Sequence, residues 1–123
     1  NVGEKMQNKV FVNFSNHPSA GWGREQAEAA SRYGQLIDLP FPAVEAKADE
    51  EAVRHLAEQY VEQILNCHPA AVLCQGEFCL TFLVVSALKA QGITVLAACS
   101  ERIVTERGNK KEVTFQFERF RKY

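Results

Sequence analysis

One stretch of the chain, residues 70–92, constrains the fold more than any other. Its sequence, AAVLCQGEFCLTFLVVSALKAQG, opens with an apolar run over residues 71–74 that predicts a strand buried on both faces. The polar turn Gln75-Gly76-Glu77 follows, and apolar side chains at helical spacing then predict a helix over residues 78–91. Gly92 suits the left-handed C-terminal cap of such a helix. The stretch therefore predicts a strand-turn-helix unit of an open α/β sheet, with ligands expected at the turn.

Hydrophobic patterns place the other elements around this unit. Strands are expected at residues 9–14, 35–39 and 93–98, and helices over residues 24–33, capped by Gly23, and 50–66, capped by Asp49. Residues 103–105 and 113–117 alternate around a Gly-Asn turn, which predicts a C-terminal β-hairpin. The order of elements predicts an α/β fold with four parallel strands in spatial order 2-1-3-4, followed by the hairpin.

Length and composition set the broad class of the protein. A chain of 123 residues, 46% hydrophobic and 24% charged, predicts a single domain over residues 9–123, and residues 1–8 are expected to be a disordered leader or an expression remnant. No apolar run approaches the roughly 20 residues of a membrane span and no signal-peptide pattern is present, so we expect a cytoplasmic protein without a membrane partner.

The four cysteines do not predict a metal site. Cys67, Cys74, Cys79 and Cys99 form no Cys-x-x-Cys pair, and no histidines stand at ligand spacing. We therefore interpret the cysteines as buried and reduced, and we expect neither a metal nor a cofactor.

Charge is distributed unevenly along the chain. Residues 1–100 carry seven Lys or Arg against eleven Asp or Glu, whereas residues 101–123 carry seven against four. The basic C-terminal segment could contact phosphates, or its charges could protect an edge hairpin from aggregation, and the sequence leaves both interpretations open.

The loops that follow the first, third and fourth strands should share one rim of the sheet, because the carboxyl ends of parallel strands meet at one edge. This rim gathers Asn16, His17, Ser19 and Trp22 with Gln75, Gly76 and Glu77, and with Ser100, Glu101 and Arg102.

Several of these rim residues have a chemical and a structural interpretation. His17 could exchange protons at neutral pH or bond its own loop backbone, and Trp22 could stack a base or anchor the loop. Gln75 could read a base edge or satisfy backbone groups, and Gly76 could admit a ligand close to the backbone.

The charged rim residues are equally open. Glu77 could act as an acid or base or cap the helix, and Arg102 could clamp a phosphate or pair with a glutamate. No Walker loop, Gly-x-Gly-x-x-Gly motif or metal-ligand cluster is present, which argues against a dehydrogenase, an ATPase or a zinc hydrolase. Metal-free phosphate chemistry or ligand binding remains.

Longer runs of the sequence resemble a known group of proteins. The segments VFVNFSNHPSAGW, LIDLPFP, LCQGEFCLTFLVV and ACSERIV and the ending FERFRKY resemble the small CRISPR-associated proteins of type III systems, and most closely the compact Rossmann-like members related to ring nucleases. The parallels are a Gln-Gly-Glu-Phe turn that includes Phe78, a strand ending in Ser-Glu-Arg, and an Arg-Phe-Arg terminus.

The resemblance implies a CARF-like three-layer sandwich and a homodimer that binds a cyclic oligoadenylate, most closely the tetramer, in a cleft across its two-fold axis. It implies cleavage of this messenger without a metal to products with a 2′,3′-cyclic phosphate, or else sequestration by a non-catalytic sponge or sensor; a protein- or RNA-interaction module is the third hypothesis. No duplex nucleic acid is expected as a partner. In this hypothesis the catalytic residues are His17, Arg102 and Ser100, and the ligand-binding residues are Asn16, Ser19, Trp22, Gln75, Gly76, Glu77, Phe78 and Glu101.

Overall fold

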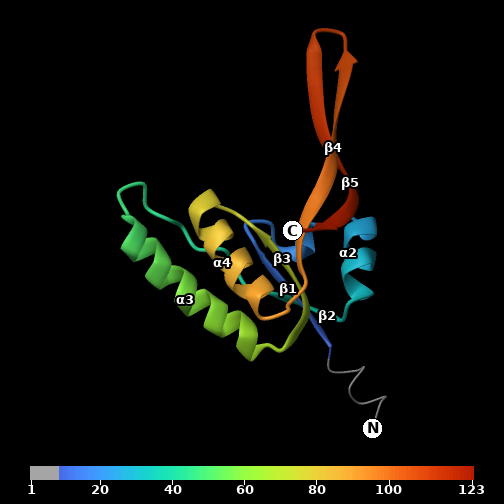
Figure 1. The fold of residues 1–123 in the computed structure, drawn as a ribbon. Helices are drawn as coiled ribbons and strands as arrows, with labels where there is room; N and C mark the ends of the chain where they lie inside the picture. The colour runs from blue at the N-terminus through green and yellow to red at the C-terminus, as the bar shows by residue number, and fades with distance from the viewer. Residues whose placement is uncertain (1–8) are drawn as a thin grey trace.

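The computed structural model describes residues 9–123, and the expected leader, residues 1–8, lies outside this part of the chain. The described residues have a mixed α/β fold, in which helices lie against a five-stranded sheet (Figure 1). The strands are β1 (Val10–Ser15), β2 (Gln35–Asp38), β3 (Pro69–Gln75), β4 (Val95–Arg107) and β5 (Lys110–Lys122). The helices are η1 (Ser19–Gly21, a single 3₁₀ turn), α2 (Arg24–Ser31), α3 (Glu50–Asn66) and α4 (Phe78–Ala90).

The sheet has the strand order β2-β1-β3-β4-β5. The first four strands in this order pair in parallel, which agrees with the predicted order 2-1-3-4, and β5 returns antiparallel to β4. The prediction of separate strands at residues 93–98 and 103–105 is wrong, because β4 runs unbroken through both. Polar residues between them do not interrupt the strand because both faces of the ribbon are open to solvent there.

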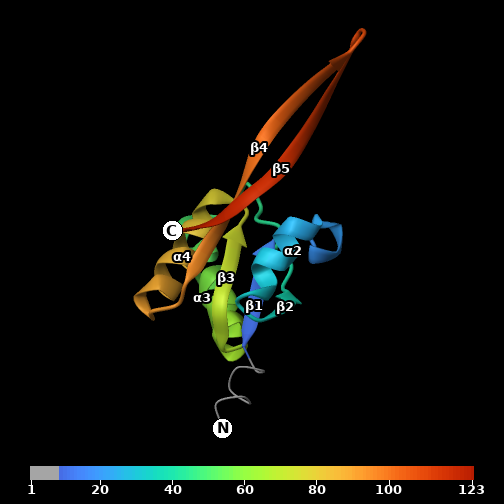
Figure 2. The same cartoon turned by 90° about the vertical axis from the view of Figure 1, so that its right-hand side faces the viewer.

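The two faces of the sheet carry separate cores. Helices α3 and α4 cover one face, and α2 lies on the other (Figure 2). On the α3/α4 side, Phe14 stacks on Tyr60 with ring centroids 5.1 Å apart and contacts Phe41 at 4.7 Å. On the α2 side, Phe11 contacts Phe120 at 5.3 Å. Helices on both faces explain why β1 and β3 are apolar along nearly their whole length.

Beyond Ser100, β4 and β5 leave the body of the protein as a two-stranded ribbon, residues 100–117, which we call the arm (Figures 1 and 2). The predicted Gly-Asn turn closes it, and Gly108 has the positive φ, 63°, that a tight hairpin turn requires at this position.

One face of the arm carries its large exposed apolar side chains, interleaved with charged ones. Arg102 pairs across the ribbon with Phe115, and Val104 pairs with Val113. Directly paired side chains lie on the same face and alternate along each strand, so these residues share a face with Ser100 and Phe117. Phe117 packs into the α2-side core, so this face of the arm, called the apolar face below, continues the α2 side of the sheet.

A bulge joins the arm to the body. The register of the hairpin shifts between Cys99 and Ser100, so that Cys99 pairs with Arg119 and Ser100 with Phe117. The extra residue, Glu118, brings Phe117 and Phe120 to the same face, where their ring centroids lie 4.9 Å apart. A bulge as well as strand alternation is therefore needed to bring these two rings to one face.

The cysteines are less uniform than the sequence suggested. All four are free, and Cys74 is buried, which raises the pKa of its thiol to about 12. Cys79, however, is exposed because it follows the first residue of α4 on the outer side of that helix, so the prediction that the cysteines are buried is wrong there. In residues 9–123 no helix combines the length and apolarity needed to cross a membrane.

Candidate functional site

A cavity of about 610 Å³ lies at the carboxyl edge of the parallel strands, where the arm leaves the body. Four of the predicted rim residues line it together: His17, Trp22, Gln75 and Ser100. The other lining residues are Ser15, Gly21, Gly23, Gln26, Leu73, Ala98, Phe115 and Phe117. The predicted convergence of three loops on one rim is thus present, and we call this space the rim cavity.

The backbone of His17 is held by three neighbouring side chains. Its carbonyl oxygen accepts hydrogen bonds from Asn13 Nδ2 at 2.9 Å and Trp22 Nε1 at 3.1 Å, and Ser15 Oγ lies 3.3 Å from it. Its N–H donates to Ser15 Oγ at 3.2 Å. The imidazole takes part in none of these bonds, so the loop is fixed while the ring stays available on an exposed residue that lines the rim cavity.

Trp22 anchors this loop. Its indole N–H is used by the carbonyl oxygen of His17, and its ring packs edge-on against Phe11, with centroids 6.3 Å apart, and against Phe120 at 6.3 Å. The anchoring interpretation of Trp22 is therefore confirmed.

A buried polar network, which the sequence did not reveal, supports the same loop. Asn13 is 1% exposed and donates to Asp38 Oδ1 at 2.9 Å, while its own Oδ1 accepts from Ser15 Oγ at 2.6 Å. Asp38 also accepts from the N–H of Ser19 at 3.1 Å and from its hydroxyl at 3.0 Å. Ser19 is thus engaged by the end of β2, and it does not line the rim cavity. Polar residues inside the apolar first strand were the available signal for Asn13.

Gln75 presents a hydrogen-bond donor to the rim cavity. Its side-chain Oε1 accepts a hydrogen bond from the backbone N–H of Ala98 at 2.8 Å. The parallel pairing of β3 with β4 ends at Leu73 and Leu96, so the side chain takes the place of a backbone acceptor for this N–H. This bond fixes the orientation of the amide and leaves its NH₂ group as the free end. Ser100, one strand away, adds a hydroxyl from an exposed residue.

The rest of the predicted turn serves the structure. A Cβ on Gly76 would lie 2.5 Å from ring atoms of Phe41, so this glycine makes room for the ring, and it does not line the rim cavity. Glu77 caps α4, with Oε1 accepting from the N–H of Leu80 at 2.7 Å. Phe78 is 90% exposed and lies in a different groove, between α3 and α4.

Arg102 and Glu101 lie on the arm, on opposite faces. Arg102 is paired directly with Phe115, which lines the rim cavity, so the guanidinium is on the cavity's side of the ribbon. Glu101 pairs with Gln116 on the other face. Asn16 is an exposed loop residue outside the lining. Of the rim residues that do not line the cavity, Arg102 is therefore the one placed to reach its contents.

Two aromatic residues of the cavity come from the far end of the chain. Phe115 is 70% exposed and Phe117 is half-buried, and both face the loop that carries His17. Their two-residue spacing puts both rings on one face of β5, and the pairing of β5 with β4 places that face beside β1.

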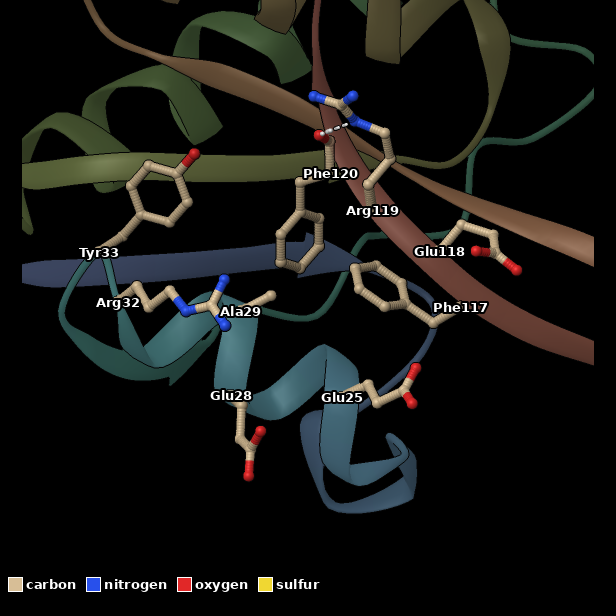
Figure 3. A pocket seen from close by; sticks show the side chains of 9 residues that line it. All are labelled: Glu25, Glu28, Ala29, Arg32, Tyr33, Phe117, Glu118, Arg119 and Phe120. Carbon is tan, nitrogen blue, oxygen red and sulfur yellow. Dashed lines mark hydrogen bonds between the residues drawn. The ribbon is translucent and has the colours of Figure 1, made fainter.

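A second cavity, of about 470 Å³, lies between α2 and the base of β5 (Figure 3). Three carboxylates, Glu25, Glu28 and Glu118, outnumber the guanidinium of Arg32 in its lining, and the guanidinium of Arg119 turns away as Nε donates to the carbonyl oxygen of Phe120 at 3.2 Å. This surface suits a phosphate poorly.

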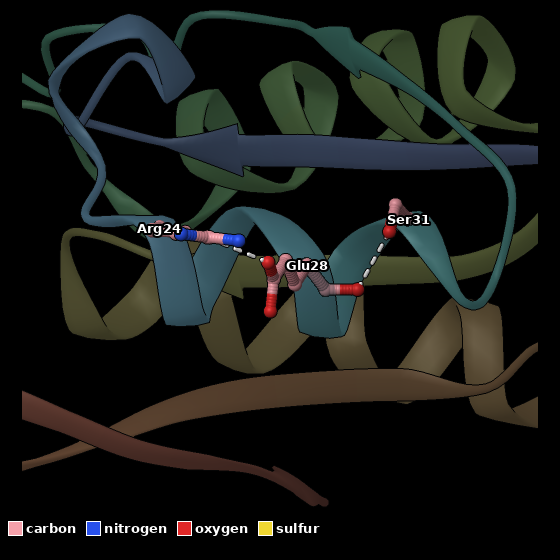
Figure 4. Close-up of polar contacts among 3 residues, drawn as sticks. All are labelled: Arg24, Glu28 and Ser31. Atoms are coloured by element: carbon pink, nitrogen blue, oxygen red, sulfur yellow. Dashed lines mark hydrogen bonds and ion pairs between the residues drawn. The ribbon is translucent and has the colours of Figure 1, made fainter.

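One ion pair on α2 is formed within the helix. Arg24 Nε lies 2.9 Å from Glu28 Oε1, and Ser31 Oγ donates to the carbonyl oxygen of Glu28 at 2.6 Å (Figure 4). The N-cap Gly23 offers no side chain to the first N–H groups of the helix, and it lines the rim cavity. Among residues 9–123 no group of three or more His, Cys, Asp or Glu side chains is arranged to hold a metal ion.

The fold and the site together define a mixed α/β protein with a ligand-sized cavity at the carboxyl edge of its parallel strands. The chain belongs to the uncharacterized protein MJ1673 family, whose model matches residues 9–121. Comparison with curated proteins gives no match.

Proposed function

We propose that this protein binds a cyclic oligoadenylate, the tetramer first of all, in the rim cavity and cleaves it without a metal as a ring nuclease of type III CRISPR signalling. The observation that carries this proposal is the convergence of His17, Gln75 and Ser100 with the exposed ring of Phe115 around one cavity. A phosphodiester ring of adenosines needs stacking surfaces for bases, donors for phosphoryl oxygens and a proton source, and these residues supply all three.

The proposal includes a finer description of the fold and assembly. It takes the sheet and its helices as a CARF-like, Rossmann-like sandwich, located in the cytoplasm, whose ligand site is completed by a second copy. A cavity of about 610 Å³ is the size that holds a drug-like molecule, whereas a ring of four nucleotides is larger. A homodimer would provide the missing enclosure.

The proposed reaction is an internal transesterification. A ribose 2′-hydroxyl attacks the adjacent phosphorus in line, its proton passes to water, and the bond from phosphorus to the 5′-oxygen breaks. Ser100, the NH₂ group of Gln75 and Arg102 would hold the phosphoryl oxygens, and the imidazolium of His17 would protonate the departing 5′-oxygen. The products carry a 2′,3′-cyclic phosphate and a 5′-hydroxyl. Gly76 packs against Phe41 and is not among the groups proposed to hold the phosphoryl oxygens.

One observation favours the alternative of a sponge, which binds the ring without cutting it. His17 is the only titratable side chain in the lining of the rim cavity, so an acid is present there without a partner base. Cleavage would then depend on positioning and on a single proton donor.

Incubation of the purified protein with cyclic tetraadenylate in EDTA tests the proposal. Linear diadenylate with a 2′,3′-cyclic phosphate indicates the enzyme, and intact ring retained on the protein indicates the sponge. Absence of binding would refute both and leave the interaction-module hypothesis.

His17→Ala separates catalysis from binding. General acid catalysis contributes about 10²–10⁴-fold, so the variant should cleave slower by that order while affinity changes within a few fold. The rate should also be lower in alkaline than in mildly acidic solution, because the proton donor is the protonated form. His55→Ala, on the exposed surface of α3, is the matched control and should behave as wild type. A His17→Ala variant that cleaves at the wild-type rate would show that the imidazole is not the acid.

Arg102→Ala tests the phosphate contact. The variant should bind the ring more weakly by about 1.5–3 kcal/mol, the range of a charge-assisted hydrogen bond, and Arg102→Lys should recover only part of this. Arg54→Ala, on exposed α3, is the control. An unchanged dissociation constant for Arg102→Ala would remove this residue from the site.

A further inference from the structure

The arm is uncovered along its apolar face. Phe115 is 70% exposed, Val104 46% and Val113 44%, and beyond the body no helix of residues 9–123 packs on the two strands (Figure 2). A lone two-stranded ribbon is marginally stable in water, and contiguous exposed apolar side chains mark an interaction surface.

The side chains of this face are complementary to a copy of themselves. The arm begins where the body ends, at Ser100, and turns at Gly108, so the pair Val104–Val113 stands at its middle. A two-fold axis through this pair, with the two ribbons antiparallel and β4 over β4, overlaps the arms along their full length. Arg102 of each copy then faces Glu106 of the other, and Lys111 of each faces the ring of Phe115 of the other. These are an ion pair and a cation–π contact, and symmetry makes each of them twice.

We propose that two copies of this chain associate by packing the apolar faces of their arms in this antiparallel manner, an arrangement that we call the clasp. The parallel arrangement is blocked. Helix α2 lies on the same side of the sheet as the apolar face, as the packing of Phe117 against the α2-side core shows. Arms packed face to face are about 10 Å apart, which leaves no room for two α2 layers side by side. The antiparallel clasp puts the two bodies at opposite ends.

Sedimentation equilibrium of the full chain, without ligand, tests the clasp. Wild type should dimerise, and Val104→Glu should raise the dimer dissociation constant at least about 100-fold, because it buries an unpaired carboxylate on the axis. Thr114→Glu is the control: it introduces the same carboxylate next to Val113 but on the opposite face of the ribbon, across from Ile103, and it should change the constant less than about threefold. Phe82→Glu, in the separate exposed groove of α4, should also leave the dimer intact.

Charge exchange tests the register. Arg102→Glu and Glu106→Arg should each weaken the dimer, and the double variant should associate more tightly than either single one. A monomeric wild type at tens of micromolar, or a Val104→Glu dimer as tight as wild type, would overturn the clasp. So would dissociation by Phe82→Glu alone, since it would place the interface on α4.

Discussion

Replacement of Asn13 tests the network that fixes the loop of His17. Asn13 is 1% exposed, and its amide donates to the His17 carbonyl oxygen at 2.9 Å and to Asp38 Oδ1 at 2.9 Å, and accepts from Ser15 Oγ at 2.6 Å. Asn13→Ala removes all three bonds. The carbonyl of His17 keeps the bond from Trp22, and Asp38 is exposed enough for water to replace the amide.

The expected cost follows from these bonds. Each neutral hydrogen bond contributes about 0.5–1.5 kcal/mol net, and the one to the carboxylate about 1.5–3 kcal/mol. Because solvent offsets part of the loss at Asp38, we expect Asn13→Ala to lower the free energy of unfolding by about 2–4 kcal/mol. Urea unfolding followed by the fluorescence of the single tryptophan, Trp22, measures this directly.

Asn13→Asp sharpens the test because it preserves shape while it removes both donors. The new carboxylate would face Asp38 and the carbonyl oxygen of His17, so this variant should be less stable than Asn13→Ala at pH 7. Repulsion between the carboxylates raises the pKa of the pair in the folded state, so the folded protein binds more protons than the unfolded one at mildly acidic pH. Stability of this variant should consequently rise, relative to wild type, as pH falls from 7 toward 4.

Asn16→Ala is the control for both variants. Asn16 is an exposed loop residue three positions along the chain, and we expect its loss to change stability by less than about 0.5 kcal/mol. If Asn13→Ala unfolds within that same margin of wild type, the network does not stabilise the loop and the reasoning fails.

Three further variants probe the packing around β3. Gly76→Ala should lower the free energy of unfolding by about 1–3 kcal/mol in a thermal or urea melt, because the new methyl group meets the Phe41 ring at 2.5 Å. Adding Phe41→Leu should recover part of this loss. Equal stability of Gly76→Ala and wild type would contradict the contact. Tyr123→Phe removes the bond from the phenol to the Cys74 carbonyl oxygen at 2.7 Å and should cost about 1 kcal/mol by urea unfolding, a loss absent if the C-terminus is loose. Burial raises the pKa of the Cys74 thiol to about 12, so the free energy of unfolding should fall by up to about 1.4 kcal/mol per pH unit above the unfolded thiol's pKa near ~8.5. Cys74→Ala should flatten this slope between pH 8 and 10. An unchanged slope would show that another group causes the loss of stability.

Local signals in the sequence were sufficient for elements whose ends are set by nearby residues. Helix α3 spans Glu50–Asn66 as predicted because Asp49 caps it, accepting from the N–H of Ala52 at 2.8 Å, and because its apolar stripe is regular. The parallel order of four strands followed similarly from the alternation of strands and helices along the chain.

Contacts between distant segments set what the sequence could not show. Gly76 looked like a place for a ligand, but the space beside it is filled by Phe41, which arrives on the loop after β2. The side-chain amide of Gln75 is oriented by its hydrogen bond from the N–H of Ala98. That N–H is free to make this bond because the parallel pairing of β3 with β4 stops at Leu73 and Leu96. Strand register of this kind depends on how whole strands pack, and no single residue encodes it.

The basic C-terminal segment had two interpretations: contact with phosphates, or protection of an edge hairpin from aggregation. Charged residues along β5 suit an edge strand that must avoid pairing with other chains. Protection from aggregation does not account for the apolar face, because a ribbon selected for solubility alone would not leave Phe115 70% exposed between Arg102 and the rim cavity. Lys111 and Glu106 lie 4.0 Å apart and are both well exposed, so this pair adds little to the arm's own stability and both groups remain free for another partner. The charges on β5 therefore suit the protection of an edge strand, whereas contact of the basic segment with phosphates stays a prediction.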